Sequence, residues 1–188
     1  MNTLTKNQLW TITGLLLITM IFTRTHMINH VQDASWAIFF LLGFYIRKAV
    51  AFPLFWLVAF AVDLIVIESQ GGQSYCFTVS YPFLIPAYAS LWFAGRLFAK
   101  NYSENLRGLL YFTGVAVVGI VACEMFSSGG FYFFSGRFAD VNVSDFVTRL
   151  ATYLPMSMKI TLLYLAIAAV IHIAVIQAGK FTGNPHHT

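Results

Sequence analysis

A short polar segment, ESQGGQSYCFTVSYP at residues 68–82, places one of the chain's two cysteines between two strongly apolar stretches. A thiolate is a soft ligand that suits polarizable metal centres, and coordination deprotonates the thiol. Gly71 and Gly72 precede Cys76 and allow the chain to bend so that the sulfur can approach a large ligand. The segment therefore predicts a metal-ligating thiolate. A disulfide with Cys123 and an unreactive buried cysteine are the alternatives.

Asp63 lies in the apolar stretch before this segment, five residues from its start. At 1.5 Å per helical residue it is about 7 to 8 Å deeper than the segment. A carboxylate inside a membrane segment is costly and by default indicates a functional site. Lys159 is a second charge within an apolar stretch. Asp63 is therefore expected either to contact a ligand or to form a structural pair with Lys159.

Aromatic residues lie around the thiol and again in the FYFF run at 131–134. Tyr75, Phe77 and Tyr81 flank the cysteine, and Phe131 and Tyr132 begin the second group. Their flat apolar faces and hydroxyl groups are suited to packing a broad planar ligand. The alternative is an ordinary aromatic belt at the level of the lipid headgroups.

Three further side chains, those of Arg149, His26 and His30, could contact a ligand. Arg149, before the last apolar stretch, could hold an anionic or amide-bearing group through its fork of donors, or could meet a lipid phosphate. His26 and His30 are four residues apart and would share one helical face, a geometry compatible with metal binding. The alternative is that both are polar loop residues.

The elements that must carry these residues are apolar helices. Of 188 residues, 59% are hydrophobic and 10% are charged, which favours a bilayer over water as the solvent of the exterior. We predict a single all-α membrane domain over residues 1–188. Six segments qualify as spans: 9–23, 34–45, 52–67, 82–99, 109–126 and 150–177. The first is expected to be retained because no small-residue cleavage site follows it.

The basic residues predict the side of the membrane that each loop faces. Six spans put both termini on one side, and Lys and Arg concentrate in short cytoplasmic loops. With the termini inside, seven basic residues are cytoplasmic and three are external: Lys6, Arg47, Lys48, Arg96, Lys100, Arg107 and Lys180 against Arg24, Arg137 and Arg149. We predict a multi-pass protein of the bacterial cytoplasmic membrane with cytoplasmic N and C termini. The net charge of +4 then requires no nucleic-acid partner.

Motifs of several enzyme classes are absent from the sequence. It has no phosphate-binding glycine motif with lysine, no HExxH helix, no CxxC and no serine in a recognisable nucleophile setting. The chain is therefore not expected to hydrolyse ATP by itself. No two histidines lie at matching depth on two long spans, which argues against a membrane cytochrome.

The GGQSYCFTVSYP segment with Cys76 and Tyr81, Asp63 in the preceding span and Arg149 before the last span together resemble one group of transport proteins. These are the S-components, small six-span subunits that bind vitamins for energy-coupling-factor (ECF) transporters. The chain is most similar to the BtuM family of solitary, S-component-like cobalamin transporters. The resemblance covers essentially the whole chain, so the fold it implies is an S-component-like bundle.

The resemblance implies that cobalamin is the cargo and binds near the outer face. The Cys76 sulfur would be an axial ligand of the corrin cobalt, in place of the nucleotide base. Electron donation from this thiolate would weaken a ligand on the opposite face, such as cyanide. The implied activity is therefore cobalamin uptake with decyanation, and Asp63, Tyr81 and Arg149 would orient the ligand or transfer protons.

The first span differs from that of many S-components, in which small residues four apart dock on the shared transmembrane subunit. The stretch LWTITGLLLITMIFT offers only Thr11, Thr13 and Gly14. The sequence therefore gives no support for docking on an ATP-driven ECF module. Two other functions stay open: an S-component for a different vitamin, and a membrane thiol oxidoreductase that uses Cys76 and Cys123.

Overall fold

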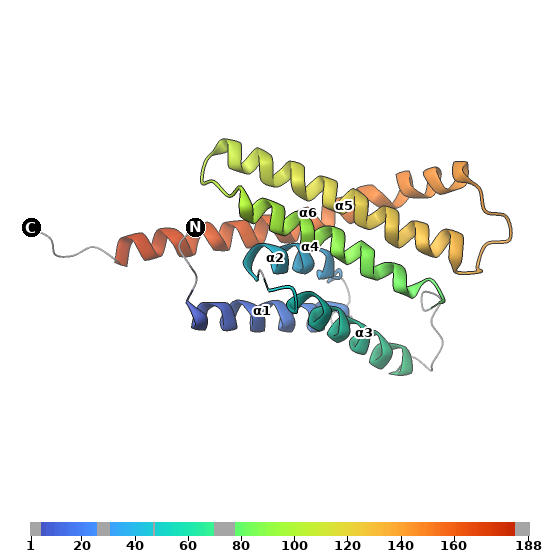
Figure 1. Cartoon of the computed structure of the whole chain (residues 1–188), viewed down its shortest axis with the longest axis horizontal. Coiled ribbons are helices and arrows are strands. Elements are labelled where there is room, and N and C mark those ends of the chain that lie inside the picture. Colours follow the sequence, from blue (N-terminus) through green and yellow to red (C-terminus); the bar gives the residue numbers. More distant parts are fainter. Residues whose placement is uncertain (1–4, 26–30, 47, 70–77, 183–188) are drawn as a thin grey trace, which may run out of the picture.

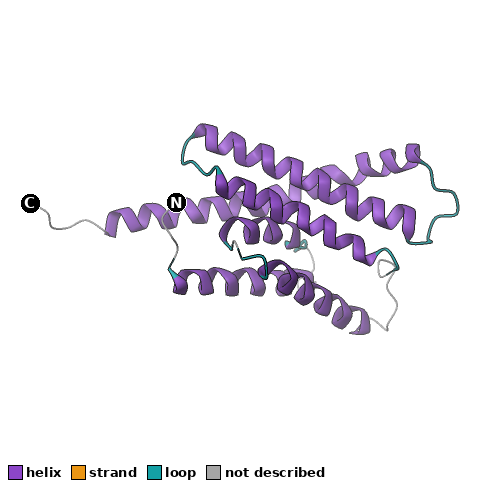
Figure 2. Ribbon diagram, viewed as in Figure 1, coloured by secondary structure: helices purple, strands orange, loops and turns teal. Residues whose placement is uncertain are grey.

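The computed structural model describes residues 5–25, 31–46, 48–69 and 78–182, and within these ranges it contains helices and no strand (Figure 2). Six α-helices follow one another, with one 3-10 turn before the fourth. They are α1 (Lys6–Arg24), α2 (Ser35–Tyr45), α3 (Ala51–Ser69), η1 (Tyr81–Phe83), α4 (Leu84–Lys100), α5 (Leu106–Phe134) and α6 (Val143–Thr182). Each predicted segment coincides with one of these helices, so the all-α fold class is confirmed.

The helices form an elongated bundle (Figure 1). The start of α1, the connection between α4 and α5 and the end of α6 lie toward one end, which we call the terminal end. The connection between α5 and α6 lies at the other end, as does the end of α3, and we call this the site end. The start of α1 and the end of α6 therefore lie toward the same end of the bundle.

Three helices are long and apolar enough to cross a membrane. They are α3, α5 and the Val143–Gln177 part of α6, while α2 is a shorter apolar helix. Large apolar side chains also cover the outside of the bundle: Trp10, Ile18, Ile65, Val118 and Val170 are 66 to 69% exposed. An apolar exterior of this kind needs lipid or a partner to cover it, and the three long helices point to a membrane protein.

The centre of the bundle is α4, which packs between α2 and α5. A Cβ atom on Gly43 of α2 would overlap the backbone carbonyl of Trp92, and one on Gly95 of α4 would overlap that of Phe40. The two helices therefore approach each other through facing glycines, so only glycine fits at this crossing. Phe40 and Phe39 beside it are fully buried.

Two predicted boundaries at the site end are wrong. The FYFF run was expected in a loop, but α5 continues to Phe134 and carries Phe131 and Tyr132 on helix. Within this helix, Gly130 packs directly on the ring of Phe83, where a Cβ atom would not fit. Arg149, expected before the last helix, lies in the second turn of α6, which begins at Val143.

Candidate functional site

A cavity of about 650 Å³ lies toward the site end of the bundle and receives side chains from all six α-helices and from η1. Its polar and aromatic walls include Arg24, Asp63, Tyr81, Glu124, Phe131 and Arg149. Four of these, Asp63, Tyr81, Phe131 and Arg149, are residues that the sequence predicts for the site. The structure therefore brings together side chains from α3, η1, α5 and α6.

Tyr132, another predicted site residue, does not line this cavity. Tyr132 is buried behind it, and its hydroxyl accepts a hydrogen bond from the backbone N–H of Asn142 at 3.1 Å. Tyr132 thus anchors the α5–α6 connection. The predicted residues Tyr75, Cys76 and Phe77, together with His26 and His30, lie outside the described residues.

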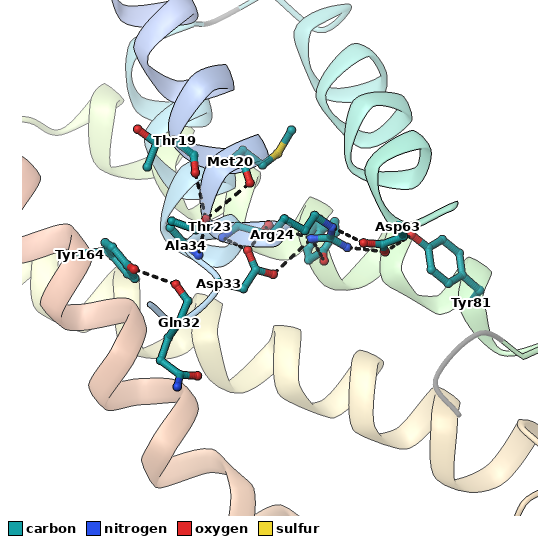
Figure 3. Close-up of polar contacts among 12 residues, drawn as sticks. Thr19, Met20, Thr23, Arg24, Gln32, Asp33, Ala34, Asp63, Tyr81 and Tyr164 are labelled. Atoms are coloured by element: carbon teal, nitrogen blue, oxygen red, sulfur yellow. Dashed lines mark hydrogen bonds and ion pairs between the residues drawn. The ribbon is translucent and has the colours of Figure 1, made fainter. Parts of the chain in front are cut away.

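Arg24, at the end of α1, holds the Asp63 carboxylate with two parallel hydrogen bonds (Figure 3). Nε donates to Oδ1 at 2.6 Å and Nη2 to Oδ2 at 2.7 Å. The arginine is 7% exposed and Asp63 is 22% exposed. A paired, fork-like geometry of this kind is the strongest form of arginine–carboxylate contact, and it is largely shielded from water here.

The third guanidinium nitrogen of Arg24, Nη1, contacts residues of two more helices. Nη1 donates to Asp33 at 3.2 Å, to the Ser35 hydroxyl at 2.7 Å and to the Tyr88 hydroxyl at 3.1 Å. One guanidinium therefore connects α1, the start of α2, α3 and α4. With one cation and two carboxylates, the cluster of Arg24, Asp33 and Asp63 carries one net negative charge when all three are ionised.

Tyr81 completes this network from η1. Its hydroxyl donates to Asp63 Oδ2 at 2.7 Å (Figure 3), and its ring meets that of Phe60 edge to face, with 5.4 Å between centroids. Burial, and after it the hydrogen bond to Asp63, raise the pKa of Tyr81 well above its usual value. Tyr81 is therefore a neutral donor at physiological pH.

The expected alternative pairing of Asp63 with Lys159 is wrong. Asp63 is paired with Arg24, and Lys159 is an exposed residue of α6. The signal for the correct partner was predicted depth in the membrane. Arg24 follows the first predicted span, and the 68–82 segment follows the span with Asp63, so both were expected on the outer side. Lys159 required its long stem to bridge a difference in depth, whereas Arg24 requires none.

Arg149 lines the cavity inside a cage of aromatic rings. Its guanidinium carbon lies 4.7 Å from the ring centroid of Phe138, 5.4 Å from that of Tyr153 and 5.7 Å from that of Tyr132. Its Nε is buried and has no hydrogen-bond partner among the described residues. A buried donor of this kind needs an acceptor, so Arg149 can receive a carbonyl or anionic oxygen from a ligand.

Glu124 of α5 is a site residue that the sequence did not single out. It is buried and lines the cavity. Its Oε1 accepts from the Ser128 hydroxyl and its Oε2 from the Ser157 hydroxyl of α6, the latter at 2.7 Å. Its position beside a cysteine in an apolar stretch was the available signal, as for Asp63.

The cysteine in the described part of the chain is Cys123. Cys123 is a free cysteine and is fully buried. Cys123 does not line the cavity, so its thiol is not placed to contact a ligand there. No group of three or more His, Cys, Asp or Glu side chains among the described residues could hold a metal ion.

A second cavity of about 520 Å³ lies between α2, α4, α5 and α6 toward the terminal end. It is mostly apolar. His172 lines it and lies between two tyrosines, with Nδ1 at 2.9 Å from the Tyr45 hydroxyl and Nε2 at 3.3 Å from the Tyr102 hydroxyl. None of the predicted site residues lines it, so the cavity at the site end is the candidate site.

Comparisons with known proteins do not extend this description: neither the models of known protein families nor the curated proteins give a match to the chain.

Proposed function

We propose that the protein binds cobalamin in the cavity at the site end and mediates its uptake across the bacterial cytoplasmic membrane. Cys76 would be the axial ligand of the corrin cobalt. The observation that carries the proposal is that Asp63, Tyr81 and Arg149 line one cavity. These three residues lie far apart in the sequence, and they are the ones to which the resemblance to the BtuM family gives roles beside the cysteine.

The covalent chain limits the distance between Cys76 and this cavity. Ile67 lines the cavity before the cysteine segment, and Ser80 lines it after the segment. Four residue steps separate Cys76 from Ser80, a distance of at most about 14 Å in a fully extended chain. The proposed thiolate ligand is therefore within reach of a corrin ring at the cavity mouth. Tyr75 and Phe77 are proposed as aromatic neighbours of the ring.

The described side chains support distinct roles in binding. Arg149 has a buried Nε without a partner, which suits a carbonyl or phosphate oxygen of the cargo. Asp63 is fully engaged by Arg24 and Tyr81, so its proposed role is to position the Tyr81 hydroxyl rather than to accept a proton. Phe131 contributes an apolar ring to the wall.

The proposal includes loss of cyanide from cyanocobalamin as a ligand exchange. A thiolate that binds one axial position of cobalt donates electron density and weakens the bond on the opposite face. The Co–C bond then breaks with its electron pair leaving on cyanide, which takes a proton from water, and the oxidation state of cobalt does not change. The protein would thus be a transporter that also alters its cargo.

For the whole chain we propose six membrane spans with both termini in the cytoplasm. The outer surface of the bundle is apolar, and the cavity lies at the end opposite the start of α1 and the end of α6. A cavity at that end would then open to the outside, where cargo arrives. Docking on an ATP-driven ECF module is not part of the proposal, because the first helix lacks the small residues for it.

Retention of cobalamin by the purified protein tests this function. The detergent-solubilised protein is incubated with cobalamin, riboflavin or biotin and passed through a desalting column. We expect cobalamin alone to elute with the protein, and Arg149→Ala to weaken its retention more than Arg137→Ala, a change at an exposed arginine. Retention of a different vitamin instead would favour the alternative of an S-component with another cargo.

A further inference from the structure

Glu124 is held in place by hydroxyl groups from two helices. It is 4% exposed, and each carboxylate oxygen accepts one hydrogen bond, from Ser128 one turn away on α5 and from Ser157 on α6. Two donors on two different oxygens fix the rotation of the carboxylate. They leave it with unused acceptor capacity, because an ionised carboxylate has about four lone-pair sites.

No cation in the described part of the chain pairs with this carboxylate. The nitrogens of Arg24 are occupied by contacts that include Asp33 and Asp63. Arg149 precedes Ser157 by eight residues on α6, about 12 Å at the helical rise of 1.5 Å per residue. A buried carboxylate without a partner cation is costly, so a donor brought by the ligand would be favourable at this position in the cavity wall.

We propose that Glu124, oriented by Ser128 and Ser157, is a binding subsite that accepts a hydrogen bond from an amide N–H group of the cargo. The inference rests on the proposed function, because the rim of the corrin ring of cobalamin carries amide side chains. Glu124 would thereby select fully amidated corrinoids over those in which the corresponding amide is still a carboxylic acid.

Charge explains the selectivity. An amide presents an N–H donor to the carboxylate oxygens of Glu124, and a hydrogen bond to a carboxylate is stronger than one between neutral groups. A carboxylate at the same place presents only acceptors and a like charge, which is unfavourable in a partly buried site.

The test compares cobalamin with its isomeric monocarboxylic acids, each of which has one rim amide hydrolysed. Affinities are measured on the purified full-length protein by titration. For the wild type we expect at least one isomer to bind about tenfold or more weakly than cobalamin, as expected for one charged hydrogen bond. In Glu124→Gln that preference should disappear, because the new side chain is neutral and can donate to the acid.

Two further variants complete the experiment. Glu68→Gln, which removes an exposed carboxylate at the end of α3, should keep the wild-type preference. Ser157→Ala should reduce it, because one of the two groups that orient Glu124 is lost. Each preference is a ratio within one variant, so a general loss of folded protein does not alter it.

The possible failures have different meanings. If the wild type binds cobalamin and all the acids equally, or if Glu124→Gln keeps the full preference, the subsite is contradicted while cobalamin binding stands. If the wild type binds neither cobalamin nor any of the acids, the proposed function is contradicted and the subsite with it.

Discussion

At the scale of single residues, Arg24 organises the wall of the cavity. Its guanidinium makes five hydrogen bonds to four side chains, those of Asp33, Ser35, Asp63 and Tyr88. Replacing this arginine therefore leaves the carboxylates of Asp33 and Asp63 without their cation, and Asp63 is the more shielded of the two. Burial makes such a loss much larger than the loss of a surface ion pair.

We expect Arg24→Leu to lower the free energy of unfolding by about 3 to 5 kcal/mol, the usual cost of removing one partner of a buried pair. The double variant Arg24→Leu with Asp63→Leu should be more stable than the single variant, because one stranded charge is gone. Equilibrium unfolding in detergent measures both. Arg137→Leu, at an exposed position of the same end, is the control and should change stability by no more than about 0.5 kcal/mol. Equal effects of Arg24→Leu and Arg137→Leu would contradict the central role of Arg24.

The sequence identified Asp63 but not its partner. The cost of a carboxylate in an apolar segment is readable from composition alone, and so is its depth along a helix. Which helices are neighbours is not readable in this way, so depth was the signal that favoured Arg24 over Lys159, and the sequence did not show that α1 lies beside α3. The sequence did not identify Glu124 as a site residue for a related reason. Its environment depends on α6 lying against α5, because α6 supplies Ser157.

At the scale of elements, the crossing of α2 and α4 fixes the centre of the bundle. Gly43 and Gly95 face the opposite backbone so closely that neither position has room for a methyl group. Tyr88, one of the residues bound by Arg24, is on the same α4 helix two turns before Gly95. A shift of α4 would therefore move part of the cavity wall as well.

We expect Gly95→Ala to destabilise the protein by about 1 to 3 kcal/mol or more, because the added methyl group forces α2 and α4 apart. Gly114→Ala is the matched control: this glycine of α5 has open space around it. That change should be neutral or slightly stabilising, since alanine favours helix over glycine. Thermal unfolding in detergent compares the two variants, and equal melting temperatures would contradict the close helix crossing.

Helix positions were predictable from the apolar runs, while the site end of α5 was not. The SSGG sequence at 127–130 has the composition of a loop. In the structure the helix continues through it, because Gly130 receives the ring of Phe83, and Phe134 stacks on the same ring at 4.8 Å between centroids. Tertiary packing overrides local propensity here, as it often does.

At the scale of the whole molecule, the proposed membrane orientation determines which connections between helices face outward. If all six helices cross the membrane with the termini inside, the connection between α4 and α5 faces the cytoplasm and that between α5 and α6 faces outward. The first connection lies at the terminal end and the second at the site end (Figure 1), so one labelling experiment can distinguish the two sides.

We expect a cysteine introduced at Ala139 to react with a membrane-impermeant maleimide on intact cells. One introduced at Ser103 should react only after the membrane is opened. Both changes are made in a background with Cys76→Ala and Cys123→Ala, so that the new thiol is the only one. The opposite pattern of labelling would invert the orientation and place the cavity on the cytoplasmic side.

The central claim, that a thiolate of this protein binds the cobalt of cobalamin, is tested most directly by the absorption spectrum of the bound corrin. Wild-type protein should shift the corrin bands on binding, and Cys76→Ala should abolish that shift. Cys123→Ala, at a free and fully buried cysteine away from the cavity, should leave it unchanged. A spectrum of Cys76→Ala identical to that of the wild type would contradict thiolate ligation.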